Sequence, residues 1–283
     1  MPQPEISLVI PVFNEEENLP ILAAEIEQAM RGVDRPYEVL FVDDGSTDGS
    51  PQALARLALQ DPRLRIVRQR RNSGQSAAME AGFRHARGEV LVTLDADLQN
   101  DPADIPRLLD KMADYDVVCG VRTRRQDDWV RRVSSRVANR VRNRVTHESI
   151  TDVGCTLRAF RAGYARRIPV FNGMHRFLPT LLRMEGARVT EVPVNHRPRL
   201  HGQAKYGIGN RLWRGIADLL AVRWMQKRWI DRRLSEEMDA WNTTPSGSPS
   251  DSSDRPASPP ASSSSGSPPS AARPASSPKP SGS

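Results

Sequence analysis

The chain lacks the long apolar run that a membrane-spanning helix requires. Such a span needs about 18 or more consecutive apolar residues. The best candidate in the 283 residues, IADLLAVRWM, is interrupted by Asp218 and Arg223. The first apolar run, ISLVIPVF, is short and follows no basic segment, so it does not resemble a secretory signal. We therefore expect neither a membrane span nor a signal peptide.

Cysteines and several common binding motifs are also scarce. Cys119 and Cys155 are too few for a disulfide framework, which indicates a reducing compartment such as the cytoplasm. The histidines show no H-x-x-x-H spacing, so we expect no zinc site. Neither G-x-G-x-x-G nor G-x-x-x-x-G-K-[ST] occurs. These absences exclude a dinucleotide-binding fingerprint and a P-loop.

The C-terminal segment lacks the apolar side chains of a folded core. Of the 41 residues from Thr243 to Ser283, 26 are serine or proline, and none is aromatic or an aliphatic larger than alanine. Such a segment cannot bury enough apolar surface to offset the entropy of ordering it. We predict one folded domain over residues 1–235 and a disordered tail over 236–283.

Alternating strand and helix signals fill the rest of the chain. Ser50, followed by Pro51, is the expected N-cap of the second helix. The alternation predicts an α/β fold with a mostly parallel, doubly wound, Rossmann-like sheet flanked by helices. Ligands of such sheets bind beyond the carboxyl ends of the strands. The expected strands are ISLVIPVF, YEVLFVDD, LRIVRQ, EVLVTLDAD and DVVCGVR.

Acidic side chains gather at these predicted strand ends. Together they would repel a bare phosphate, but not a phosphate carried on a divalent cation. Mg²⁺ and Mn²⁺ take hard oxygen ligands, commonly one or two carboxylates completed by substrate phosphates. The acidic residues are Glu15, Asp43, Asp44, Asp95 and Asp97.

Asp95 and Asp97 are the predicted metal ligands. Two positions apart in a strand, they fall on the same face, and the Gln99 amide oxygen follows as a further or water-mediated ligand. A D-x-D pair also arises by chance. Asp114 and Asp116 form such a pair, but it precedes a strand, so we expect it to be solvated.

The second and third strand ends each allow two interpretations. Asp44 accepts hydrogen bonds from a base or ribose while Asp43 orients the loop, or both belong to an ordinary turn. In RNSG, Asn72 and Gly74 contact a ligand, or they form a plain loop.

Eight motifs, in order along residues 5–230, resemble those of family 2 glycosyltransferases with a GT-A fold. The resemblance is strongest to the dolichyl- or polyprenyl-phosphate sugar synthases, the dolichyl-phosphate mannose synthase group. The motifs are PVFNEEEN, DDGSTDGS, RNSGQSAAMEAGFRHARG, LDADLQNDP, GVRTRR, TDVGCTLRAFR, HRFLPTLL and EVPVNHRPRLHGQAKYG.

The resemblance implies inverting transfer of a sugar from a nucleotide-sugar, GDP-mannose or a UDP-hexose, to a polyprenyl or dolichyl phosphate, with Mg²⁺ or Mn²⁺ as cofactor. It divides the domain into a nucleotide-sugar half (about 1–123), an acceptor half (124–207) and a membrane-proximal helix (208–232). It places Pro11, Asn14, Glu15 and Asp44 at the nucleoside, Asp95, Asp97 and Gln99 at the metal and diphosphate, and Arg122, Arg199 and Lys205 at phosphates. The family often has serine where this chain has Ala204, so we assign no role there.

An arginine-rich segment begins at the end of the fifth predicted strand. From Arg122 to Arg144 there are nine arginines and two aspartates, with an apolar residue at every fourth position from Trp129 to Val145. This pattern predicts a basic amphipathic helix that seeks a membrane surface or packs its valines on the core. Arg131 and Ser135 are candidate phosphate contacts or part of a solvated face.

Asp152, in TDVGC, contacts a sugar hydroxyl, orients the acceptor, or is only a turn residue. The last helical pattern, about 208–230, combines apolar spacing with three tryptophans and several basic residues. Such side chains suit the headgroup level of a bilayer. We therefore expect peripheral attachment to the cytoplasmic face of a membrane, with a separate membrane-anchoring partner as an option.

Three other functions fit parts of the sequence. A family 2 transferase could act on a sugar hydroxyl in cell-envelope glycan synthesis. A processive polysaccharide synthase would need Q-x-x-R-W and several spans, but QKRW is one residue short. A nucleic-acid binder would show stacking aromatics where the basic segment has valines, so we expect no nucleic acid as partner.

Overall fold

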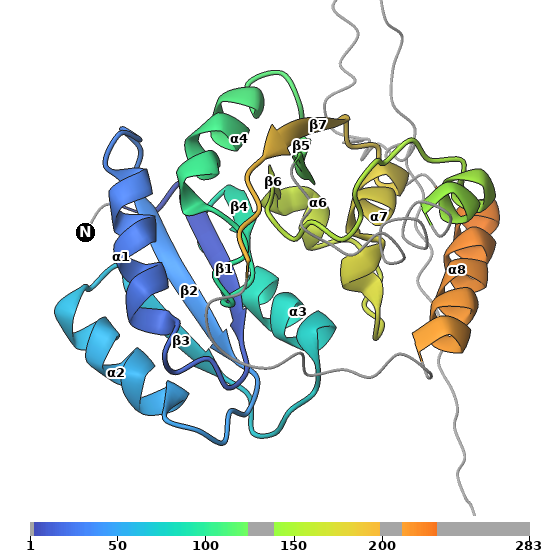
Figure 1. Ribbon diagram of the computed structural model, residues 1–283. Coiled ribbons are helices and arrows are strands. Elements are labelled where there is room, and N and C mark those ends of the chain that lie inside the picture. The colour runs from blue at the N-terminus through green and yellow to red at the C-terminus, as the bar shows by residue number, and fades with distance from the viewer. Residues whose placement is uncertain (1–2, 124–138, 199–210, 231–283) are drawn as a thin grey trace, which may run out of the picture. The chain divides into compact units, whose positions relative to one another are not determined.

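The structure is a computed structural model that describes residues 3–123, 139–198 and 211–230 (Figure 1). The chain divides into two units, Met1–Leu234 and Ser235–Ser283, and every described residue belongs to the first. The Ser/Pro-rich tail and four predicted site residues lie outside the described residues, so their roles stay predictions. These residues are Arg131, Ser135, Arg199 and Lys205.

A seven-stranded sheet runs through the described unit in the order β3-β2-β1-β4-β6-β5-β7 (Figure 1). Its strands are β1 (Ile6–Val12), β2 (Tyr37–Asp43), β3 (Leu64–Arg68), β4 (Val90–Thr93), β5 (Val117–Arg122), β6 (Arg158–Arg161) and β7 (Val189–Val194). β6 runs antiparallel to β4 and β5, while the other pairings of these strands are parallel. The predicted mostly parallel sheet and its first five strands are confirmed; β6 and β7 extend it.

Helices cover both faces of the sheet (Figure 1). They are α1 (Leu19–Met30), α2 (Ser50–Gln60), α3 (Gln75–His85), α4 (Ile105–Lys111), α6 (Ala162–Ala165), α7 (Leu178–Met184) and α8 (Arg211–Arg228), with 3-10 turns η1 (Pro102–Asp104) and η2 (Met174–Arg176). Alternate residues of β1 pack against the helices on opposite faces of the sheet. Leu8 and Ile10 join a core with α1, α2 and α4, whereas Val9 joins a core with α3 and α7. Because both faces are covered, the strands read as almost continuous apolar runs.

The start of α2 differs from the prediction and bears on the site. Gly49 is the N-cap, and Ser50 is the first helical residue. The Ser50 hydroxyl accepts a hydrogen bond from the Glu15 backbone N–H at 2.9 Å. Ser50 therefore ties α2 to the loop that follows β1 instead of capping its own helix.

The last described helix, α8, is held mainly along one side. Val222 is fully buried against the second core. The Gln226 amide donates to the Thr146 carbonyl at 2.8 Å, and Arg223 contacts His147 at 2.9 Å. Within the described ranges, no helix combines the length and apolar character that crossing a bilayer demands.

The carboxyl ends of six strands lie at one edge of the sheet, because only β6 among the described strands is reversed. β4 stops at Thr93, opposite Arg158 at the start of β6. Asp95 and Asp97 therefore lie in the following loop, and the expectation that a strand would place them on one face is wrong. The loop bends at Leu98, whose φ is 61°.

At the amino ends of β1, β2 and β3, a buried carboxylate joins the strands by hydrogen bonds. Glu38 on β2 accepts hydrogen bonds from the Ser7 hydroxyl (2.6 Å), the Arg65 guanidinium (2.6 Å) and the Arg87 backbone N–H (2.8 Å). Burial alone would raise the pKa of Glu38, but these hydrogen bonds and the Arg65 charge hold the pKa below its ordinary value. The fold therefore stabilises the charged form.

Glu38→Ala should lower the free energy of unfolding by about 3 kcal/mol at pH 7, because Arg65 and Ser7 lose their buried partner. Since folding lowers the pKa of Glu38, its contribution is present above the unfolded value of about 4.3 and is lost as pH falls through the folded value. Urea unfolding at pH 7 and pH 3.5 measures both effects. Glu5→Ala, which breaks an exposed 2.8 Å ion pair with Arg35, is the control, and equal losses would contradict the assignment.

Candidate active site

A pocket lies where β1, β2 and β4 end and α3 begins. Four of its lining residues are acidic, and all four were predicted from the sequence to contact donor or metal. The lining residues are Pro11, Val12, Phe13, Glu15, Asp44, Gln75, Ala78, Asp95, Ala96 and Asp97. The structure thus brings residues from three separate strand ends into one concavity.

Asp95 lies between the start of α3 and Asp97. The Gln75 side-chain amide donates a hydrogen bond to Asp95 Oδ1 at 2.8 Å. Burial, and next the Asp97 charge, raise the pKa of Asp95 to about 7 against a hydrogen bond from Thr156. The pair is therefore destabilised by its own negative charge, and a cation would relieve it.

The donor chemistry of Asp95 and Asp97 fits a divalent metal ion such as Mg²⁺ or Mn²⁺. Asp97 is buried, and its Oδ1 accepts the Gln99 backbone N–H at 3.2 Å. The described parts of the chain contain no group of three or more His, Cys, Asp or Glu side chains arranged to hold a metal. A metal here would therefore need further oxygens, from the predicted Gln99 amide or from a substrate.

Asp44 forms the pocket wall next to β2 and anchors the neighbouring loop. Its two oxygens accept the backbone N–H groups of Ser73 and Gly74, both at 2.8 Å. Burial raises the pKa of Asp44, although these hydrogen bonds oppose the rise. Gly45 has a φ of 70°, and a Cβ there would lie 2.6 Å from the Arg71 carbonyl carbon. Only glycine allows this close approach of the two loops. Asn72, which follows Arg71, is exposed.

Asn14 is engaged by the loop after β2. Its Oδ1 accepts the Thr47 backbone N–H at 2.8 Å, and its Nδ2 donates to the Thr47 hydroxyl at 3.3 Å. The Glu15 carboxylate accepts a 2.6 Å hydrogen bond from the Asn18 amide and lines the pocket. Asn14 thus orders the loop, whereas Glu15 adds charge to the pocket itself.

The second D-x-D pair has a structural role that the sequence did not reveal. Asp114 is exposed, as expected, but Asp116 is buried. Asp116 forms ion pairs with Arg161 (3.3 Å) and Arg188 (3.2 Å), and it accepts the Arg188 backbone N–H at 2.9 Å. The prediction of solvation is wrong for Asp116, because arginines from β6 and beside β7 enclose it.

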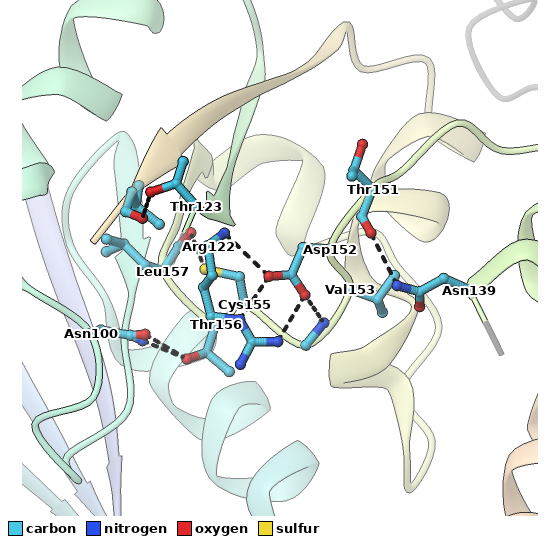
Figure 2. A network of polar contacts seen from close by, with 12 residues as sticks. Asn100, Arg122, Thr123, Asn139, Thr151, Asp152, Val153, Cys155, Thr156 and Leu157 are labelled. Carbon is cyan, nitrogen blue, oxygen red and sulfur yellow. Dashed lines mark hydrogen bonds and ion pairs between the residues drawn. The ribbon is translucent and has the colours of Figure 1, made fainter. Parts of the chain in front are cut away.

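A second charged group lies at the end of β5 (Figure 2). Arg122 Nε and Nη2 donate to the two oxygens of Asp152 at 2.7 and 2.8 Å. The Gly154 backbone N–H donates to the same carboxylate at 3.2 Å. The sequence predicted a phosphate contact for Arg122 and left Asp152 open, and the structure joins the two in a bidentate pair.

Other polar residues around these groups were not predicted. Gln75 orients Asp95, and the Thr156 hydroxyl donates to the Asn100 amide oxygen at 3.2 Å (Figure 2). Arg158 is 1% exposed and donates to the carbonyls of Val153 (2.7 Å) and His175 (2.8 Å). Their motifs were visible in the sequence, but no local pattern marked these side chains as neighbours of the site.

Comparison with known proteins finds close relatives. The family described as Glycosyl transferase family 2 matches residues 7–168. An undecaprenyl-phosphate 4-deoxy-4-formamido-L-arabinose transferase from Edwardsiella ictaluri is 42% identical over 206 residues, which cover 72% of this chain and 63% of the relative. A dodecaprenyl-phosphate galacturonate synthase from Rhizobium johnstonii is 38% identical over 229 residues, covering 79% and 68%. This chain thus spans about two thirds of the length of these relatives.

Solved structures share the fold. A mannosyltransferase from Pyrobaculum calidifontis in complex with GDP-Man and Mn²⁺ is 24% identical with a TM-score of 0.56, covering 80% of this chain and 64% of that one. Glucosyl-3-phosphoglycerate synthase from Mycobacterium tuberculosis, in complex with Mg²⁺ and UDP, is 17% identical with a TM-score of 0.60, covering 81% of each. At these identities the likeness concerns the fold, and it confirms the predicted GT-A class.

Asp95→Asn should stabilise the metal-free protein by about 2.5 kcal/mol more at pH 8 than at pH 5. The folded pKa of about 7 lies above the unfolded value, so stability falls as pH rises between the two. Asparagine carries no charge and escapes this loss. Thermal unfolding in EDTA at pH 5 and pH 8 measures this difference. Asp114→Asn should leave the melting temperature unchanged at both pH values. Equal melting temperatures of Asp95→Asn and wild type at both pH values would disprove that ionised Asp95 is destabilised by its surroundings.

Proposed function

Because this chain belongs to glycosyl transferase family 2, we propose that it transfers a sugar from a nucleotide-sugar to a polyprenyl phosphate, with inversion at the anomeric carbon. The observation that carries the proposal is the crowded pair Asp95 and Asp97 in a pocket at the carboxyl edge of the sheet. Relatives named for undecaprenyl and dodecaprenyl phosphate support the acceptor class. Their names differ in the sugar, so the donor requires a screen.

On the donor side, the chain supplies an acidic pocket with fixed acceptors. Asp44 is held by two backbone N–H groups and can accept hydrogen bonds from a ribose or base. Glu15 and Pro11 line the same concavity beside β1. We assign these residues to the nucleoside, with Asn14, Asn72 and Gly74 shaping the loops around it.

A Mg²⁺ or Mn²⁺ ion held by Asp95 and Asp97, with Gln99 as a further ligand, would neutralise the diphosphate leaving group. The protein orients both carboxylates through its own contacts. The Gln75 amide holds Asp95, and the Gln99 backbone N–H holds Asp97. The Mn²⁺ and GDP-Man of the Pyrobaculum mannosyltransferase support a metal of this kind.

On the acceptor side, the nucleophile needs little activation. A phosphate monoester is largely ionised at neutral pH, so a general base is unnecessary. Arg122 can donate hydrogen bonds to the phosphate at the end of β5, and Asp152 fixes the guanidinium plane through two hydrogen bonds. A sugar hydroxyl would need a base, and Asp152 is committed to Arg122. This pairing favours the phosphate acceptor over the hydroxyl alternative.

Helix α8 supplies a surface for peripheral membrane binding. Trp213, Leu220 and Trp224 are 73%, 61% and 63% exposed, and its last turn carries Lys227 and Arg228. Exposed tryptophans beside basic residues suit the headgroup region. We place the protein on the cytoplasmic face, with or without a membrane-anchoring partner. The free thiols of Cys119 and Cys155 fit that compartment.

Asp97→Ala should reduce transfer by roughly 10³-fold or more, because the site loses a metal ligand and the leaving group loses its compensation. The fold should persist, since removing one of two crowded carboxylates relieves repulsion. The assay measures radiolabelled sugar in a butanol-soluble, mild-acid-labile product, with GDP-mannose, UDP-glucose, UDP-N-acetylglucosamine and a uronic-acid nucleotide as donors.

Two controls accompany this assay. Asp114→Ala, an exposed carboxylate in the other D-x-D pair, should transfer like wild type. EDTA should abolish transfer and Mn²⁺ should restore it. Near-normal turnover of Asp97→Ala would remove the metal assignment, and label found only in water-soluble products would reject the lipid-phosphate acceptor.

The double variant Trp213→Ala/Trp224→Ala should weaken binding to vesicles containing anionic lipid by about tenfold, because it removes exposed apolar area at the headgroup level. Vesicle sedimentation measures the partition coefficient. Leu59→Ala, which removes a side chain 88% exposed on α2, should bind like wild type. Equal binding of all three proteins would exclude α8 as the contact surface.

A further inference from the structure

The loop that carries Asp152 is held by hydrogen bonds to the residue before it and to the residue after it. Ahead of it, Glu191 on β7 accepts hydrogen bonds from Thr151, at 2.7 Å from its backbone N–H and 2.7 Å from its hydroxyl. Behind it, Arg158 on β6 donates to the Val153 carbonyl at 2.7 Å. Two charged side chains, from the two strands that flank β5, therefore fix the residues on either side of Asp152.

Glu191, which accepts the hydrogen bonds from Thr151, belongs to a strand of the sheet. Glu191 pairs in register with Cys119 of β5, three residues before Arg122 on the same strand. The two strands thus position both members of the pair: β5 carries Arg122 directly, and β7 holds Asp152 through Glu191 and Thr151. The Glu191 carboxylate also lies 3.5 Å from the Asp152 backbone nitrogen.

We propose that Glu191 is a positioning residue for the Arg122–Asp152 pair and acts on it through Thr151. The proposal rests on the proposed function in one respect: it takes this pair as the contact for the acceptor phosphate. Glu191 itself touches no substrate. Its carboxylate keeps the Asp152 oxygens aligned with Arg122, and a loop freed from it would let the guanidinium plane turn.

Kinetics of three variants test this role. Glu191→Ala removes both hydrogen bonds to Thr151 and should lower kcat by about 10–100-fold, as expected for a misplaced contact group. The KM for the nucleotide-sugar should stay within twofold, because Glu191 does not line the donor pocket. Glu191→Gln keeps the shape and one acceptor oxygen and should retain at least a third of kcat. Thr151→Val, which loses only the hydroxyl bond, should fall between them.

A matched control separates positioning from general stability. Glu27→Ala removes an α1 carboxylate that forms 3.9 Å ion pairs with Arg31 and Arg63, and it should leave kcat and KM unchanged. A purely structural Glu191 would lower the melting temperature and raise the donor KM together with the fall in kcat. That result, or a kcat of Glu191→Ala equal to wild type, would overturn the proposal.

A second measurement does not depend on turnover. The Arg122–Asp152 coupling is the non-additive change in melting temperature of Arg122→Met and Asp152→Asn in a double-mutant cycle. We expect the Glu191→Ala background to lose at least half of the coupling seen with Glu191 present. If Glu191→Ala removes the coupling but the wild-type protein transfers no sugar from any donor, the proposed function is refuted and the positioning role of Glu191 stands. An unchanged coupling would refute the positioning even where transfer is normal.

Discussion

Electrostatic repulsion between Asp95 and Asp97 is the constraint on which the site depends. Parallel strands place their carboxyl ends at one edge, so acidic loops that are distant in sequence meet there. Three neighbouring groups stabilise the charged form of Asp95. The Gln75 amide and the Thr156 hydroxyl hydrogen-bond to it, and Arg158 contributes a positive charge. These groups offset the unfavourable effects only in part, because burial, and next the Asp97 charge, still raise the pKa of Asp95 to about 7. A cation and a diphosphate would complete the arrangement.

The reversed strand β6 determines what else reaches this edge. Because β6 runs antiparallel to β4 and β5, its first residue and the loop before it lie at the carboxyl edge. Thr156 and Arg158 therefore reach the site, and Asp152 meets Arg122 on the far side of β6 (Figure 2). A parallel strand would have carried this loop to the opposite edge. In the proposed function, β6 thus separates the donor carboxylates from the acceptor pair.

The sequence predicted the first five strands and the acidic edge because strands buried on both faces must be apolar over several residues. β6 was missed since RAFR is short and half arginine, and its burial depends on neighbours far away in the chain. The same reason hid Asp116, whose arginine partners come from β6 and from the residue before β7. Ser50 was misjudged because a long-range bond to Glu15 replaced the local cap.

The contacts of α8 connect membrane binding to the acceptor pair in the proposed function. The helix docks on Thr146 and His147, at the end of a helix over residues 139–146. From that helix, Asn139 donates to the Thr151 carbonyl at 3.0 Å, next to Asp152 (Figure 2). A lipid phosphate lies at the headgroup level, where the exposed tryptophans of α8 would also rest. In the proposed function, the helix that would meet the bilayer therefore supports the loop that orients Arg122, through the helix over residues 139–146.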